Sequence, residues 1–146
     1  MKYVLMDETH VSAVAELEKI CFSDPWSVNS IMSEVHNPLS CWYVAVDGDR
    51  LVGYIGSQSV LGWADMMNLA VHPDYRGQGI GKQLVKMLVD YLMNNDVSCL
   101  TLEVRVSNTP ARNLYEKMGF SEVGRRPGYY RNPKEDALIL RKEWKL

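Results

Sequence analysis

The chain has 146 residues, 47% of them hydrophobic, and a net charge of −2, which predicts one globular domain over residues 1–146. The slightly negative charge offers no basic surface for nucleic acid, so we expect no direct nucleic-acid partner. No apolar run approaches 18 residues and the first six residues are too few for a signal peptide, so we expect a cytoplasmic protein without a membrane partner.

The three cysteines, Cys21, Cys41 and Cys99, are scattered and odd in number. They form no Cys-x-x-Cys pair and no cluster with histidine, so we expect reduced thiols and no metal site.

The first half of the chain predicts a short strand, two helices and three strands. Residues 4–6 suit a strand, and apolar residues recur at helical spacing over residues 9–22. Ser27 can cap a second helix, which ends near Val35 because Asn37 and Pro38 follow. The three predicted strands cover residues 41–46, 51–60 and 66–72.

The second half predicts a helix, a strand, a helix and two strands. The first helix begins at Ile80 and has leucines every four residues up to Leu92. A strand over residues 99–106 leads to a helix that Pro110 opens and Gly119 ends. The last two strands cover residues 120–124 and 135–140, with a polar loop between them. This order predicts a mixed α/β (α+β) fold: a mostly antiparallel sheet of six to seven strands, four helices and one parallel crossover.

The segment "YRGQGIGKQL" places three glycines directly before the helix at Ile80. Glycines allow several backbone N–H groups to turn toward one anion, and a helix N-terminus adds further donors. A Walker A loop is disfavoured because Gln83 stands where Ser or Thr is needed, and the dinucleotide pattern GxGxxG is not matched. We therefore expect a pyrophosphate here; the alternative is a tight turn without a ligand.

Two stretches, "NLAVHPDYRGQGIGKQLV" and "NTPARNLYEKMGF", resemble the GNAT superfamily, which transfers acetyl from acetyl-CoA to amines. The resemblance covers nearly the whole chain. Within the superfamily, "DPWS", "LEVRVSN", "GYY" and "EDALIL" resemble the bacterial ribosomal-protein-alanine N-acetyltransferase family. This likeness implies a twisted sheet whose fourth and fifth strands splay apart, with acetyl-CoA in the gap.

The resemblance also assigns roles to individual residues. Glu103 would be the general base and Tyr115 the general acid. Asn108 would reach the cofactor from the start of its helix. The backbone groups that hold the pantetheine arm and thioester would come from Leu69, Ala70 and Val71. The pyrophosphate would lie against Arg76, Gly77, Gln78, Gly79, Ile80, Gly81 and Lys82.

The residues themselves leave other roles open for both catalytic candidates. Strand alternation places Glu103 on one face with Thr101 and Arg105, so an ion pair with Arg105 or plain solvent exposure is an alternative. Tyr115 shares a helix face with Ala111 and Met118, so it could equally be a core tyrosine.

Three aromatic residues are candidates for peptide binding. Trp26 could line a peptide groove or belong to the core, whereas Tyr129 and Tyr130 lie in the predicted polar loop. By resemblance this loop would clamp an incoming N-terminal peptide.

We therefore expect a monomeric enzyme that acetylates the N-terminal alanine of a small-subunit ribosomal protein, protein eighteen, by direct attack. The alternatives are a GNAT enzyme acting on a small-molecule amine or a lysine side chain, and a CoA-binding module without catalysis. The lower pKa of an α-amino group, about 7.7–8.0 against about 10.4 for lysine, mildly favours the N-terminal acceptor.

Overall fold

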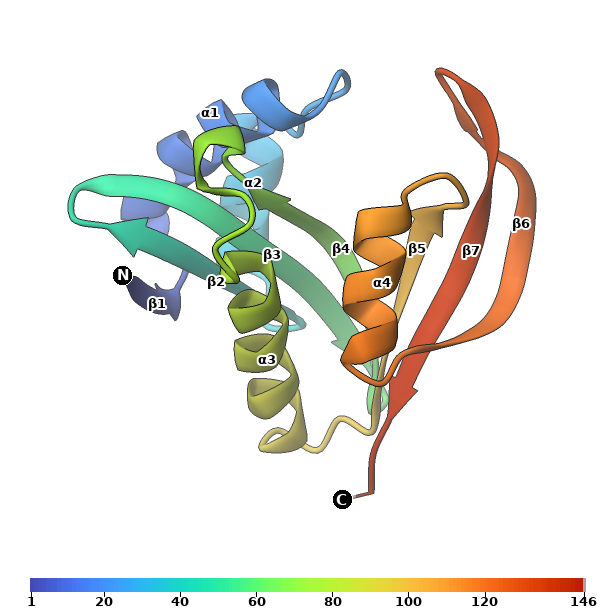
Figure 1. Ribbon diagram of the computed structural model, residues 1–146. Coiled ribbons are helices and arrows are strands. Elements are labelled where there is room, and N and C mark those ends of the chain that lie inside the picture. The colour runs from blue at the N-terminus through green and yellow to red at the C-terminus, as the bar shows by residue number, and fades with distance from the viewer. Residues whose placement is uncertain (146) are drawn as a thin grey trace.

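The computed structural model describes residues 1–145 as one seven-stranded sheet with helices on both faces (Figure 1). The strands are β1 (Lys2–Leu5), β2 (Ser40–Asp47), β3 (Arg50–Val60), β4 (Trp63–Val71), β5 (Cys99–Arg105), β6 (Ser121–Arg131) and β7 (Lys134–Glu143). The helices are α1 (Val11–Cys21), α2 (Val28–Val35), α3 (Ile80–Met93) and α4 (Thr109–Lys117). Two short 3₁₀ turns cover Glu8–His10 and Pro73–Tyr75.

The strand order is β1-β2-β3-β4-β5-β7-β6, and β4 and β5 are parallel while the other neighbours are antiparallel. The parallel ladder runs only from the pair Trp63–Cys99 to the pair Asp65–Thr101. Beyond that point the two strands diverge, and Figure 1 shows them opening as a V. The predicted mixed sheet with splayed fourth and fifth strands is confirmed.

Each face of the sheet has its own apolar core. The alternation of β3 sends Tyr54 into the cluster under α1 and α2, and its neighbour Ile55 into the cluster under α3 and α4. The leucines of α3 at the predicted four-residue spacing are all buried, which confirms that helix and its apolar face.

The ends of two helices follow the local chemistry of the sequence. Ser27 accepts a hydrogen bond from the backbone N–H of Ser30 (3.1 Å) and so caps α2 as predicted. Gly119, after α4, has a φ of 92°, and a Cβ there would lie 2.7 Å from Nζ of Lys142. A glycine is therefore required where the chain leaves this helix.

The prediction of a polar loop between residues 124 and 135 was wrong. Strand β6 continues to Arg131 and pairs with β7 at Arg126–Ala137 and again at Tyr130–Glu135. The register shifts between these pairs, at the bulge that holds Pro127 and Gly128. A proline-containing polar stretch is tolerated because β6 is the edge strand of the sheet.

Candidate active site

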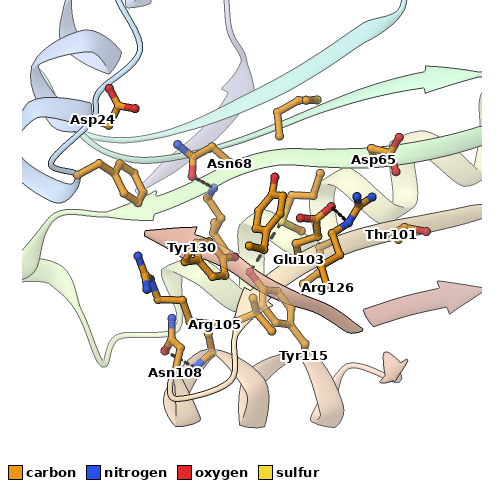
Figure 2. A pocket seen from close by; sticks show the side chains of 18 of the residues that line it. Asp24, Asp65, Asn68, Thr101, Glu103, Arg105, Asn108, Tyr115, Arg126 and Tyr130 are labelled. Atoms are coloured by element: carbon orange, nitrogen blue, oxygen red, sulfur yellow. Dashed lines mark hydrogen bonds and ion pairs between the residues drawn. The ribbon is translucent and has the colours of Figure 1, made fainter. Parts of the chain in front are cut away.

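A cavity of about 740 Å³ opens where β4 and β5 separate. Its lining comes from β4, β5, α4 and β6, and from the segment that follows α1. Figure 2 shows Glu103 and Tyr115, on different elements, facing this space. The cavity therefore gathers side chains that are distant in the sequence around the unpaired part of β4.

Glu103 lies on β5 with its side chain 27% exposed. Its Oε1 forms an ion pair with Nε of Arg126 at 3.1 Å (Figure 2). Its Oε2 is buried and has no hydrogen-bond partner among residues 1–145. One carboxylate oxygen is thus held by a cation, and the other is a buried acceptor without a hydrogen-bond partner among residues 1–145.

Arg126 reaches Glu103 because of the register across β7. Glu103 lies opposite Ile139, Ile139 lies opposite Gly124, and Arg126 two residues on projects from the same face. The alternative of an ion pair between Glu103 and Arg105 was wrong, and Arg126 was missed. The signal that would reveal Arg126 is this alternation along β6, but the segment reads as a loop.

Arg105 holds the turn of the β6–β7 hairpin instead. Its Nη1 donates to the carbonyl of Pro133 (2.9 Å) and lies 3.2 Å from Oε1 of Glu135. Its guanidinium also stacks over the ring of Tyr130, 4.3 Å from the ring centre. These contacts fix Tyr130 at the edge of the cavity.

Tyr115 is 6% exposed and reaches the cavity from α4. Its hydroxyl makes one weak contact, to Sδ of Met66 at 3.8 Å. Burial, with a smaller effect of Tyr130, raises the pKa of this hydroxyl well above its ordinary value. Tyr115 is thus a core tyrosine that presents a neutral hydroxyl to the cavity.

Asn108 and the three aromatic candidates all line the cavity. Asn108 caps α4, since its Oδ1 accepts from the backbone N–H of Ala111 at 3.3 Å. Trp26 packs edge-on against Trp42 at 5.5 Å, so it belongs to the core on one side and to the cavity on the other. Tyr129 is 51% exposed, and its ring lies 5.1 Å from that of Tyr130.

The glycine loop follows β4 and leads into α3. Gly77 and Gly79 have φ values of 81° and 80°, and a Cβ at either would meet no atom within 4 Å. Gly81 lies within α3 and outside the left-handed region, and its nearest neighbours would be 3.8 Å from a Cβ. The loop is therefore open at Gly77 and Gly79 and leads directly into the first turn of α3, whose N–H groups have no partner within the helix; this arrangement suits a diphosphate.

The other predicted cofactor residues lie along the same path. Leu69 lines the cavity, and Ala70 and Val71 continue β4 toward the loop. Nε of Arg76 donates to the carbonyl of Val71 at 3.2 Å, which ties the loop to the end of the strand. Within residues 1–145, the cavity lining includes none of residues 70–82, so the loop extends the site beyond the cavity.

Residues 11–120 match the family described as the acetyltransferase (GNAT) family. The chain belongs to this family. Acetyl-CoA-dependent N-acetyl transfer is the activity of the family, and the gap between β4 and β5 is where the fold opens.

Two relatives and one solved structure are similar to this acetyltransferase over most of its length. A Bacillus subtilis protein to which ribosomal protein bS18-alanine N-acetyltransferase activity is ascribed is 39% identical over 131 residues, 89% of this chain and 87% of that protein. The Escherichia coli ribosomal protein bS18-alanine N-acetyltransferase is 34% identical over 137 residues, 92% of each chain. The crystal structure of an E. coli ribosomal-protein-S18-alanine N-acetyltransferase superposes with a TM-score of 0.91 at 31% identity, covering 99% of this chain and 94% of that one.

Two further findings concern the described part of this acetyltransferase. Residues 1–145 contain no group of three or more His, Cys, Asp or Glu side chains placed to hold a metal ion. No helix in this range has the length and apolar character needed to cross a membrane.

Proposed function

We propose that this acetyltransferase transfers acetyl from acetyl-CoA to the N-terminal alanine of ribosomal protein bS18, by direct attack of the amine in a ternary complex. The names of the relatives support this acceptor. The observation that carries the chemistry is the pairing of an unsatisfied buried oxygen of Glu103 with the buried hydroxyl of Tyr115 in one cavity. A ribosomal acceptor supports our proposal that the enzyme acts in the cytoplasm.

Glu103 is proposed as the base that takes the proton from the acceptor amine, through a water molecule. Its Oε2 has the burial and the vacant hydrogen-bonding capacity that this role needs. Arg126 neutralises the other oxygen in the free protein, so the two carboxylate oxygens differ in their surroundings. An α-amino group, with a pKa of about 7.7–8.0, is already partly neutral near pH 7, so a carboxylate is an adequate base for it.

Tyr115 is proposed as the acid that protonates the departing thiolate. Burial raises the pKa of the hydroxyl, which by itself weakens the acid. The same low-dielectric surroundings disfavour a thiolate anion, so the pKa of the leaving thiol rises in parallel. A neutral hydroxyl whose one contact is a weak sulfur contact is also free to turn toward a new acceptor.

The donor is proposed to lie along β4 and over the glycine loop. Residues 69–71 offer backbone groups to the pantetheine arm and thioester, and Arg76 with residues 77–82 surrounds the diphosphate. Asn108 approaches from the opposite side of the gap. Acetyl-CoA supplies the activated acyl group.

The acceptor peptide is proposed to enter between Trp26 and the pair Tyr129 and Tyr130. These side chains line the cavity on opposite sides of the gap, from the segment after α1 and from β6. The acetyltransferase is proposed to act as a monomer.

The test is acetylation of a peptide with the N-terminal sequence of bS18, followed by mass spectrometry. We expect acetyl on the α-nitrogen of the alanine and none on an internal lysine. The control peptide has the same sequence with a blocked α-amine and must remain unmodified. Faster acetylation of free small amines or of lysine side chains would identify those amines as the acceptor instead. Acetyl-CoA binding without acetylation of any amine would indicate a binding module.

A further inference from the structure

A second carboxylate lies behind the cavity, and the mechanism above does not use it. Glu18 of α1 is 0% exposed and belongs to the side of the sheet covered by α1 and α2. Its Oε2 is buried without a hydrogen-bond partner among residues 1–145. A buried carboxylate with an unsatisfied oxygen lowers the stability of the fold, so its presence calls for an explanation.

Glu18 contacts the cavity through one residue, Asn68. Nδ2 of Asn68 donates to Oε1 of Glu18 at 2.8 Å and lies 3.4 Å from the hydroxyl of Tyr54. Burial first, and then Glu18 itself, raise the pKa of Tyr54, as expected beside a carboxylate. Asn68 in turn lines the cavity (Figure 2), whereas Glu18 is not part of the lining.

The other end of the Asn68 side chain holds the backbone of β4. Its Oδ1 accepts from the N–H of Leu69 at 3.0 Å (Figure 2). This contact lies beyond the last residue pair of β4 and β5 and beside the register shift between Gly56 and Ser57 on β3. The N–H of Leu69 therefore has a side-chain acceptor at the position where β4 has no β5 partner.

Glu18 determines which way the carboxamide of Asn68 points. A carboxylate only accepts hydrogen bonds, so it selects the orientation with Nδ2 toward itself and Oδ1 toward Leu69. The reverse orientation would set two acceptors against each other at Glu18 and two donors against each other at Leu69. One buried charge thus fixes one backbone donor at the edge of the cavity.

We propose that Glu18 is a positioning residue that acts through Asn68 to keep the Leu69 N–H oriented for the thioester carbonyl of acetyl-CoA. In the free protein Oδ1 of Asn68 holds this N–H, and the acetyl carbonyl replaces or shares that bond on binding. This inference rests on the proposed function, because it needs acetyl-CoA against β4. Its signature is specific to the acetyl group, since CoA carries a free thiol in place of the acetyl thioester and shares the rest of the molecule.

The test is the ratio of the Kd of CoA to the Kd of acetyl-CoA, measured by calorimetry for the wild type and Glu18→Gln. Glutamine keeps the shape of the side chain but can donate, so it permits the reversed carboxamide. We expect the ratio to fall about 2- to 10-fold, the worth of one hydrogen bond, with the Kd of CoA nearly unchanged. The kcat should fall with it, while the KM for the peptide should stay the same.

The matched control is Glu34→Gln. Glu34 is also buried and accepts hydrogen bonds from Trp42 and Gln58, but it does not line the cavity. Its substitution should lower the melting temperature and leave the ratio of the two Kd values as in the wild type. In the double variant Glu18→Gln with Asn68→Ala, the ratio of the two Kd values should be the same as in Asn68→Ala alone. Glu18 acts through Asn68, so its substitution has no further effect once Asn68 is removed.

The outcomes separate this inference from the proposed function. A wild type that binds neither CoA nor acetyl-CoA would overturn both. A wild type that acetylates the peptide while Glu18→Gln keeps the ratio, or weakens CoA and acetyl-CoA equally, would overturn the role of Glu18 alone. An additive double variant would do the same, because the two residues would then act independently.

Discussion

The two walls of the cavity are built in different ways. On the β4 side, Asn68 is backed by two residues with no exposed surface, Tyr54 and Glu18. On the other side, Arg126 and Tyr129 are more than half exposed and are held by an ion pair to Glu103 and by a cation–π contact with each other. The core wall presents fixed backbone groups, and the hairpin wall presents charged and aromatic side chains. Such a division suits a constant donor on the first wall and a selected acceptor on the second.

The largest expected effect comes from replacing the proposed base, Glu103 of β5, which pairs with Arg126 of the hairpin wall. Glu103→Gln should lower kcat/KM for an alanine-led peptide about 10²–10⁴-fold, the range for loss of a general base. The loss should be greatest at low pH, where more of the acceptor amine is protonated and needs a base. The measurement is kcat/KM across pH for both proteins. A variant whose pH profile overlies that of the wild type would assign the proton transfer to another group.

The second-largest effect concerns the hydroxyl of Tyr115, which α4 contributes to the cavity. Tyr115→Phe should lower kcat about 10²-fold, the low end of general-acid effects, with little change in the Kd of acetyl-CoA. Since burial raises the pKa of Tyr115 above 10.0, the hydroxyl stays protonated as the pH rises toward that value. The wild type should therefore show no fall in kcat from Tyr115 below about pH 10. Normal turnover of Tyr115→Phe would contradict this assignment. So would a fall in the wild-type kcat below pH 10 that is absent from the variant.

Strand β4 and the glycine loop were predictable from the sequence, whereas the strand pairing of β6 and the buried Glu18 behind Asn68 were not. The strand, glycine loop and helix at residues 66–92 depend on local signals: apolar spacing, three glycines and a helix start. The ion pair between Glu103 and Arg126 depends on how β5 and β6 each pair with β7, which no local sequence signal reveals. The bulge with Pro127 also makes the segment that contains Arg126 look like a loop in the sequence. Glu18 was equally hidden, because a glutamate on an amphipathic helix is ordinarily exposed.

A smaller effect distinguishes a ligand-binding glycine loop from a plain turn. Gly81→Ala adds a methyl group whose nearest neighbours lie at 3.8 Å, so the fold should tolerate it. Alanine also favours the helix by about 0.5–1 kcal/mol, so the melting temperature should stay level or rise. The Kd of acetyl-CoA should nevertheless rise about tenfold, equivalent to about 1.4 kcal/mol, because the methyl group obstructs close approach of the diphosphate.

Gly79→Ala provides the contrast for this substitution. Its φ of 80° is unfavourable for alanine, so stability should fall by about 1 kcal/mol along with affinity. Calorimetry and thermal melting of both variants separate the two contributions. Wild-type affinity in Gly81→Ala would mean that the diphosphate does not contact this part of α3.

The smallest effect tests whether the hairpin wall competes with the acceptor. In the free protein the guanidinium of Arg126 neutralises Glu103, and an incoming α-ammonium group seeks the same carboxylate. Both partners are partly exposed, so their pair is worth about 1 kcal/mol at most. Arg126→Gln should therefore lower the KM for the peptide only a few-fold, by removing the competing cation.

Arg125→Gln is the control, because Arg125 is similarly exposed but pairs with Asp136, away from Glu103. The two variants have the same net charge, so a general electrostatic effect would change the KM equally in both. A lower KM in Arg126→Gln alone would show that the guanidinium and the ammonium compete for one carboxylate. A higher KM in Arg126→Gln would mean that this arginine holds Glu103 in place for the acceptor, and the hairpin wall would then be preorganised like the β4 wall.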